Sequence, residues 1–209
     1  MAKMNYQNDY PSVTTILGIL RKIGLENWFK YTPIKQINEE SNKGKLIGTQ
    51  IHEAIHTYIE TGKTSVKTEY VEEVSNALKS FIQFRKDLPQ IKLRNAEIAM
   101  TSEIYKFNGT RDCNGDEETI PILLDWKTGK AKKKDKPDIY DEYKYQVAAY
   151  CFLYKETTGI MPQKAYILAL AKDKIAYNLC MMDRLEIENC FNEVFLPTLR
   201  IWNYQNRKG

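Results

Sequence analysis

The sequence predicts an α/β (α+β) fold in which a mixed central β-sheet is flanked by helices, with an N-terminal helical portion. Three observations lead to this fold class. Apolar residues recur at helical spacing over roughly the first 90 residues, the pattern changes to strand-like alternation after Pro89, and a further helical segment separates the third predicted strand from the fourth. Helices arranged in this order around a run of strands pack on the faces of one sheet.

Three helices are predicted in the N-terminal portion. The segment 10–31, YPSVTTILGILRKIGLENWFKY, contains Pro11-Ser12, which is typical of a helix start, followed by apolar residues at helical spacing. A second helix is predicted from about residue 45 to 61, where Gly62 ends it. A third is predicted over about 69–88 and stops before the proline that follows.

Five strands and two more helices are predicted after this portion. Alternation over residues 95–107 and the dipeptide Asn108-Gly109 predict a hairpin, whose return strand lies within 110–118. Residues 119–129 form the most apolar strand. The remaining predicted elements are a lysine-rich loop over 130–137, a helix over 138–159, strands over 164–173 and 174–180, and a final helix over about 183–205.

Length and composition favour a single folded domain over residues 1–209. The chain is 43% hydrophobic and 11% aromatic, and its formal net charge of +4 permits nucleic-acid binding without indicating it. We divide the domain into a mostly helical part (1–90), a core sheet with its crossover helix (91–182) and a C-terminal helix (183–209). No apolar run approaches the roughly 20 residues of a membrane span, and the polar N-terminus lacks the apolar centre of a secretory signal. We therefore expect a cytoplasmic protein.

Asp125 and Lys127 are the first candidates for chemistry. They lie two residues apart on a predicted strand, so both side chains leave the same face, while Trp126 leaves the other. A surface ion pair is the ordinary explanation of an isolated D-x-K. Asp112, however, lies on the preceding predicted strand, and two carboxylates brought together by adjacent strands repel each other unless a cation lies between them. Such hard oxygen ligands suit Mg²⁺ or Mn²⁺.

The segment IGTQIHEAIHTYIE contains His52, Glu53 and His56 in the order H-E-x-x-H, a pattern found in zinc peptidases. On a helical wheel His52 lies at the edge of the apolar face and His56 lies further towards solvent. The extended peptidase pattern requires glycine where this chain has Ile59, and the chain has no third histidine. An HExxH zinc peptidase is therefore the weaker alternative.

Five motifs in order resemble one nuclease family. Asp112 followed by Asp125-Trp126-Lys127 is similar to the PD-(D/E)XK signature, with Arg111 in place of its proline. The segments GTQIHEAIH, GTRD and YQVAAY resemble the histidine helix, the G-x-x-D turn and the Q-x-x-x-Y helix of the RecB-like exonuclease branch, and YPSVTTIL resembles phage and mitochondrial genome-maintenance exonucleases.

The resemblance implies a restriction-endonuclease-like sheet and divalent-metal-dependent hydrolysis of DNA phosphodiesters. By this resemblance, Lys127 of this chain would assist the attacking water, and Gln146 and Tyr150 would line the site. The implied metal ligands are His52, Asp112, Asp125 and the main-chain carbonyl of Trp126. Some members hold an iron–sulfur cluster, but no such cluster is expected here, because the cysteines, Cys113, Cys151, Cys180 and Cys190, do not follow its spacing and form no C-x-x-C pair.

Further residues are candidates for metal binding or for contacts with DNA. Glu97, on the first predicted strand, is a candidate additional metal or water contact, with a solvated strand face as the equal alternative. The loop after the D-x-K strand is predicted to contact DNA phosphates without base preference, together with Arg111; its lysines are Lys130, Lys132, Lys133 and Lys134. Three tyrosines are candidates for stacking on bases, with helix-core packing as the alternative: Tyr140, Tyr143 and Tyr145.

The sequence thus favours a DNA exonuclease that acts on single-stranded or double-stranded ends, in phage or bacterial replication, recombination or repair. Phage recombination or replication proteins are its expected partners, and a bacterial or phage-infected cell its expected setting. A structure-dependent endonuclease on the same site is the nearest alternative. A non-catalytic DNA-binding subunit is less favoured, because such a chain has little reason to retain repelling carboxylates beside a lysine.

Overall fold

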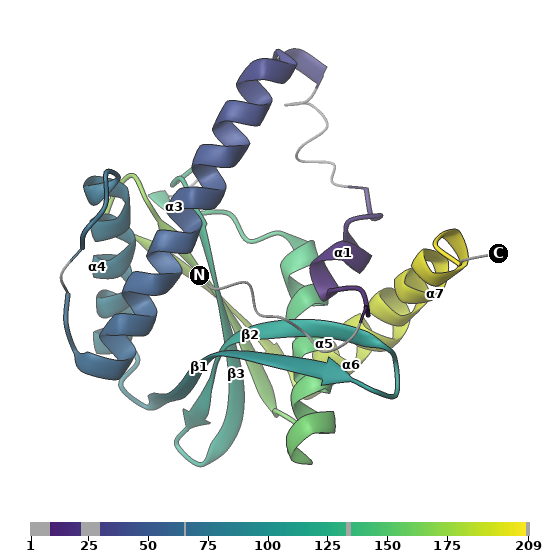
Figure 1. Ribbon diagram of the computed structural model, residues 1–209. Coiled ribbons are helices and arrows are strands. Elements are labelled where there is room, and N and C mark those ends of the chain that lie inside the picture. Colours follow the sequence, from purple (N-terminus) through teal and green to yellow (C-terminus); the bar gives the residue numbers. More distant parts are fainter. Residues whose placement is uncertain (1–8, 22–29, 65, 133–134, 208–209) are drawn as a thin grey trace.

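The computed structural model describes residues 9–21, 30–64, 66–132 and 135–207, and its centre is a five-stranded mixed sheet with helices on both faces (Figure 1). The strands are β1 (Ile91–Ser102), β2 (Phe107–Glu117), β3 (Ile120–Gly129), β4 (Lys164–Ala171) and β5 (Tyr177–Asp183), in the spatial order β1-β2-β3-β4-β5. The β3–β4 pair is parallel and the other three pairs are antiparallel. A parallel pair requires a crossover, which the helix between β3 and β4 provides. The predicted fold class is confirmed.

The helices are α1 (Val13–Leu17), α3 (Ile34–Thr61), α4 (Val71–Asp87), α5 (Asp141–Thr158), α6 (Arg184–Asn189) and α7 (Leu196–Gln205), with a π-helical turn η2 (Cys190–Phe195) joining the last two. Ser12 caps α1, as the sequence predicted, by accepting a hydrogen bond from Thr15 N. The predicted continuation of this first helix falls partly on residues 22–29, which lie outside the described residues. Among the helices described, none combines the length and apolar character needed to cross a bilayer.

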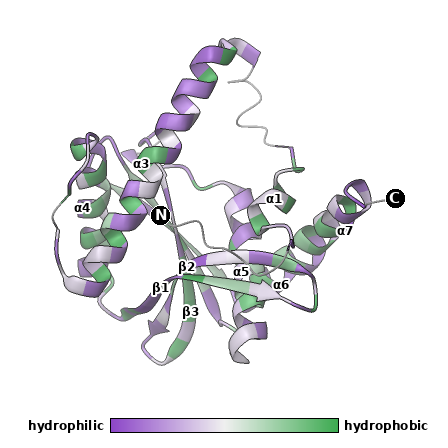
Figure 2. Ribbon diagram, in the orientation of Figure 1, coloured by the Kyte–Doolittle hydropathy of each residue, from purple (hydrophilic) through white to green (hydrophobic). Residues whose placement is uncertain are grey.

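The second helix begins earlier than the sequence predicted. It ends before Gly62, as expected, but α3 starts at Ile34 instead of near residue 45. The additional half projects away from the sheet and is largely hydrophilic (Figures 1 and 2), and Ile34 itself is 77% exposed. Because this additional segment belongs to neither apolar core of the described residues, it has no apolar periodicity from which it could be predicted.

The sheet separates two apolar cores. On one face, α3 and α4 pack their apolar side chains against Trp126 and Leu124 of β3. On the other face, α5, α1 and the C-terminal helices pack around Leu123. Strand β3 is therefore buried on both faces, and its alternation fixes which side chains enter each core. The candidate site lies beside the first core, where the middle parts of β1, β2 and β3 approach the second half of α3.

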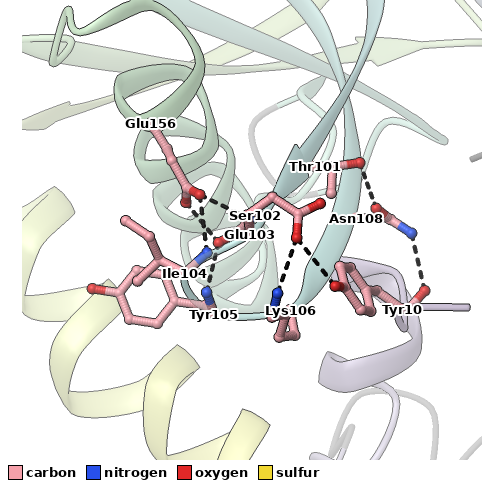
Figure 3. A network of polar contacts seen from close by, with 9 residues as sticks. All are labelled: Tyr10, Thr101, Ser102, Glu103, Ile104, Tyr105, Lys106, Asn108 and Glu156. Atoms are coloured by element: carbon pink, nitrogen blue, oxygen red, sulfur yellow. Dashed lines mark hydrogen bonds and ion pairs between the residues drawn. The ribbon is translucent and has the colours of Figure 1, made fainter. Parts of the chain in front are cut away.

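The predicted position of the first hairpin turn is wrong. Asn108 and Gly109 lie inside β2, and the turn occupies residues 103–106, where Lys106 adopts a positive φ of 59°. Asn108 serves a different purpose: its side-chain amide donates to Tyr10 O at 3.1 Å, which ties β2 to the segment before α1 (Figure 3). Gly109 lets β2 pass close to α5, because a Cβ there would lie 2.8 Å from the Tyr150 ring.

A carboxylate from α5 holds the turn in its actual position. Glu156 accepts hydrogen bonds from Glu103 N at 2.8 Å, from Ile104 N at 3.0 Å and from the Ser102 hydroxyl at 2.6 Å (Figure 3). Main-chain N–H groups of a tight turn need acceptors, and a charged acceptor forms stronger hydrogen bonds than a neutral one. The local Asn-Gly preference is thus overridden by a contact between segments far apart in the sequence.

Candidate active site

Three side chains from three different elements converge beside the first core. His52 of α3, Glu97 of β1 and Asp112 of β2 each present one ligand atom, and these atoms lie within 4.8 Å of one another. His52 Nδ1 lies 3.1 Å from Glu97 Oε1 and 3.6 Å from Asp112 Oδ1. The His52 ring is also held by an edge contact with Trp126, with centroids 5.8 Å apart. One imidazole and two carboxylates form a donor set that suits a divalent cation.

A β-bulge brings Glu97 into this cluster. The β1–β2 register shifts between Leu93 and Ala96, and Glu97 adopts a positive φ of 54°. Left-handed backbone is unfavourable for a residue with a side chain, and such conformations occur often at functional sites. The bulge turns the carboxylate towards His52, so the strand alternation on which the prediction for Glu97 rested does not describe this position.

Asp112 is buried and tied to the neighbouring strand. Its Oδ2 accepts a hydrogen bond from Trp126 N at 2.8 Å, directly after Asp125 in β3. Burial raises the pKa of the Asp112 carboxyl to about 7, and the negative charge of Asp125 adds to the increase, which the positive charges of His52 and Lys127 only partly offset. Burial lowers the pKa of His52, but the carboxylates of Asp112 and Glu97 outweigh burial and raise it above its ordinary value.

Asp125 and Lys127 form a buried charge pair next to Asp112. The side chain of Asp125 is 1% exposed and that of Lys127 18%, and Lys127 Nζ lies 2.7 Å from Asp125 Oδ2. Lys127 is therefore the partner of Asp125 Oδ2, whereas Asp125 Oδ1 has no hydrogen-bond partner among the described residues. Burial lowers the pKa of Lys127, yet attraction to Asp125 and Asp112 outweighs it and raises the pKa, which keeps the ammonium protonated.

The Asp125 Oδ1 atom tests whether the site fits a metal ion. A buried carboxylate oxygen without a donor is unfavourable unless a cation supplies the missing interaction. Asp125 presents one such oxygen, and its negative charge acts on Asp112, whose own neighbours His52 and Glu97 present further ligand atoms. The residues present therefore fit a divalent cation. The role predicted for the Trp126 carbonyl stays a prediction.

The predicted Gln146–Tyr150 pair lies on one face of α5. Gln146 Nε2 donates to the Tyr150 hydroxyl at 2.7 Å, and Tyr150 is 4% exposed. A different residue of α5 contacts the lysine: the Tyr143 ring centroid lies 5.4 Å from Lys127 Nζ. From the sequence, Tyr143 is predicted only to stack on bases or to pack in the core. Its position three residues before Gln146 was the available signal, because residues three apart share a helix face.

The residues predicted to contact DNA lie in several environments. Lys130 is exposed and lines a cleft of about 480 Å³, whereas Lys132 is engaged by Asp138 at 3.1 Å and donates to the Tyr140 hydroxyl. Arg111 is buried, and its guanidinium lies 5.1 Å from the Tyr154 ring centroid instead of at the surface. Lys133 and Lys134 lie outside the described residues.

The second histidine of the H-E-x-x-H segment is separate from the cluster. His56 Nε2 lies 3.0 Å from Glu60 Oε1, one helical turn away, and the group of three ligand residues found in the described part of the chain does not include it. His56 is about one-third exposed, in agreement with the helical wheel. The imidazole that enters the cluster is that of His52.

The fold of this protein is similar to that of solved structures described as exonucleases. The sequence matches no family model and no curated protein. Among solved structures, the chain is similar to a protein from Eubacterium rectale described as a "Putative exonuclease", at 14% identity and a TM-score of 0.50, over 77% of this chain and 68% of that one.

Two further solved structures match less closely in three dimensions. One is a phage-related exonuclease from Haemophilus somnus 129PT, at 12% identity and a TM-score of 0.43, over 94% of both chains. The other is an alkaline exonuclease from Laribacter hongkongensis, at 15% identity and a TM-score of 0.38, over 74% of this chain and 80% of that one. At these identities likeness concerns the fold, and the resemblance inferred from the motifs is confirmed at that level by the first structure.

Proposed function

We propose that this protein is a PD-(D/E)XK deoxyribonuclease that hydrolyses DNA phosphodiester bonds with a divalent metal ion, as an exonuclease acting on DNA ends. The observation that carries the proposal is the buried Asp125 carboxylate, whose Oδ1 has no hydrogen-bond partner among the described residues, next to the cluster of His52, Glu97 and Asp112. The exonuclease-like fold supports the same function. Phage or bacterial replication, recombination or repair is the proposed setting.

The metal would be held by His52, Glu97, Asp112 and Asp125, with the Trp126 carbonyl as the ligand implied by the resemblance. Oxygen ligands with a single imidazole favour Mg²⁺ or Mn²⁺. When bound, such an ion supplies a Lewis acid for a phosphate oxygen and lowers the pKa of a water molecule.

The protein's own residues would then orient the reaction. The protonated Lys127 ammonium is positioned to offset negative charge that develops on the phosphate, and its burial makes that interaction stronger than it would be in water. Asp125 keeps the ammonium near the cluster. Glu97 fixes the His52 ring, because its Oε1 accepts a hydrogen bond from His52 Nδ1 at 3.1 Å and keeps the imidazole turned towards both carboxylates.

Substitutions in the purified protein test the proposal. We expect Asp125→Asn and Lys127→Met to abolish degradation of linear DNA in Mg²⁺ or Mn²⁺ while the circular dichroism spectrum stays that of the wild type. His56→Ala is the matched control, since His56 lies on the same helix as His52 but outside the cluster; it should retain activity, whereas a zinc peptidase would lose its metal. Full activity of both site variants would reject the proposed site.

The choice of DNA decides between exonuclease and endonuclease. Linear single-stranded and double-stranded DNA should be degraded, and covalently closed circles should persist under the same conditions. Cleavage of the circles at a comparable rate would reject the exonuclease proposal in favour of an endonuclease on the same site. Binding of DNA without any cleavage, in either metal, would indicate a non-catalytic DNA-binding subunit.

A further inference from the structure

We propose that Tyr143 is a positioning residue for Lys127, and that the face of its ring holds the ammonium beside Asp125. This inference rests on the proposed function and adds a residue to it, because none of the motifs that suggested the nuclease includes Tyr143. It concerns the part of the site where the sheet meets α5, on the opposite side of β3 from Trp126 and its core.

The ammonium lies between a carboxylate and an aromatic ring. Lys127 Nζ is 2.7 Å from Asp125 Oδ2 and 5.4 Å from the centroid of the Tyr143 ring. The face of an aromatic ring carries partial negative charge and attracts a cation within about 6 Å. A lysine side chain has four rotatable bonds and loses much rotamer freedom when its ammonium group is held in one position. Two attractive groups near Nζ therefore restrict an ammonium that Asp125 alone would hold through a single contact.

The Tyr143 ring is itself held in place. Tyr143 lies in the first turn of α5, and its main-chain N–H donates to Tyr140 O at 3.0 Å. The two rings make an edge contact, with centroids 5.5 Å apart and planes at 76°. The Tyr140 hydroxyl accepts a hydrogen bond from Lys132 at 3.1 Å. The Tyr143 ring is thus supported by Tyr140, which is itself held by Lys132 of the loop between β3 and α5.

The family resemblance implies that Gln146 and Tyr150 line the site, orienting the lysine or a phosphate, and in the structure these two residues contact each other. Gln146 Nε2 donates to the Tyr150 hydroxyl, and Tyr143 makes the aromatic contact with the ammonium one turn earlier on the same helix. A ring face differs from an amide because it attracts the cation without accepting a directed hydrogen bond. The N–H donors of Lys127 consequently remain available for oxygens of a bound phosphate.

Steady-state kinetics of four variants test the inference. In Tyr143→Leu, which keeps an apolar side chain, we expect kcat at saturating linear DNA to fall by about 2- to 30-fold, with KM and DNA binding in Ca²⁺ unchanged. Tyr143→Phe should stay within about twofold of the wild type, because it retains the ring face. Phe152→Leu is the matched control on the same helix: its ring stacks on Phe191 away from the site, and its loss should leave kcat unchanged.

A fourth variant separates ring charge from ring shape. Pentafluorophenylalanine at position 143 keeps the shape of Tyr143→Phe but reverses the polarity of the ring face, so it should be slower than Tyr143→Phe, even if Tyr143→Leu fails to fold. Three results would overturn the inference: unchanged kcat in Tyr143→Leu, an increase in KM alone, or equal rates for the phenylalanine and pentafluorophenylalanine variants.

The experiment also separates this inference from the proposed function. Lys127→Met is measured in parallel. If that variant retains full nuclease activity, the proposed function of the site fails, whatever Tyr143 does. If it is inactive while Tyr143→Leu has wild-type kcat, the nuclease stands and only the role of Tyr143 is rejected.

Discussion

Replacing Asp112 by asparagine should stabilise the metal-free protein at pH 8 while abolishing its nuclease activity. The folded state raises the pKa of Asp112 from 3.8 to about 7, first through burial and then through the charge of Asp125. Each pKa unit corresponds to about 1.4 kcal/mol, so keeping this carboxylate ionised in the folded protein costs about 4 kcal/mol at pH 8. Asparagine carries no charge, and its amide oxygen can still accept the hydrogen bond from Trp126 N.

The pH range follows from the sign of this shift. Between pH 3.8 and about 7 the folded state keeps the Asp112 proton while the unfolded chain releases it, so stability falls as pH rises through this range. About 2 kcal/mol of the loss falls between pH 5.5 and 8. The raised pKa of His52 acts in the same direction, because its stabilising contribution is present below its unfolded value and is lost as pH rises through its folded value.

Urea denaturation in EDTA at pH 5.5, 7 and 8 measures the effect. The free energy of unfolding of the wild type should fall more steeply with pH than that of Asp112→Asn, by about 2 kcal/mol over this interval. Asp116→Asn, on the same strand but paired with Arg94 outside the cluster, should retain the wild-type pH dependence. Parallel curves for the wild type and Asp112→Asn would refute the reasoning, because they would mean that Asp112 ionises as easily in the folded protein as in the unfolded chain.

Two further predictions concern the metal and the hairpin. In differential scanning fluorimetry, Mn²⁺ or Mg²⁺ should raise the Tm of the wild type more at pH 8 than at pH 5.5, since protons compete for the same ligands. Glu97→Gln should show a smaller rise in Tm, because it loses one of the proposed metal ligands. An equal rise in Tm for both proteins would remove Glu97 from the ligand set. Glu156→Ala should lower the free energy of unfolding by about 1–3 kcal/mol, because three donors of the β1–β2 turn lose their acceptor. A loss of under about 0.5 kcal/mol in urea denaturation would show that water replaces the carboxylate.

The sequence predicted features of the fold that depend on neighbouring residues. The alternation of β3, the end of α3 at Gly62 and the pair formed by Gln146 and Tyr150 all follow from periodicity or backbone preference within a few residues. The first hairpin turn does not, because Glu156 stabilises a turn that the Asn-Gly preference alone would place further along the chain. The projecting half of α3 was missed for the opposite reason, since it belongs to neither apolar core of the described residues, where an apolar pattern would be required.

The candidate site divides in the same way. The side chains on β3 could be placed from alternation, and His52 from the helical wheel, because each prediction concerns one regular element. Glu97 required a bulge whose positive φ has no strong signal in the sequence, and the contact between Tyr143 and Lys127 depends on the distance between a helix and a strand. For a functional site assembled from several elements, the sequence therefore predicts which residues take part more readily than which of them contact one another.

A second charge cluster on the same sheet shows why the Asp125 site points to a ligand. Glu117 accepts hydrogen bonds from both Lys164 and the Tyr166 hydroxyl, and these lower its pKa relative to the ordinary value, with the Lys164 contact acting most strongly. That carboxylate is satisfied by the protein alone, as expected of a structural ion pair. Asp125 is more deeply buried and is paired with Lys127 through Oδ2, yet its Oδ1 has no hydrogen-bond partner among the described residues.

One bound cation would compensate for all the unfavourable features of the candidate site. Asp112 resists ionisation, Asp125 Oδ1 lacks a partner among the described residues, and Glu97 adopts a strained backbone conformation. Asp112 and Glu97 both lie next to His52, and the charge of Asp125 acts on Asp112. A folded chain gains nothing from three such features unless another interaction compensates for them. A single divalent cation held by these residues would offset the negative charge of both aspartates and supply a partner for Asp125 Oδ1. The coincidence of these features at one point is stronger evidence for a metal ion than any of the short motifs that first suggested it.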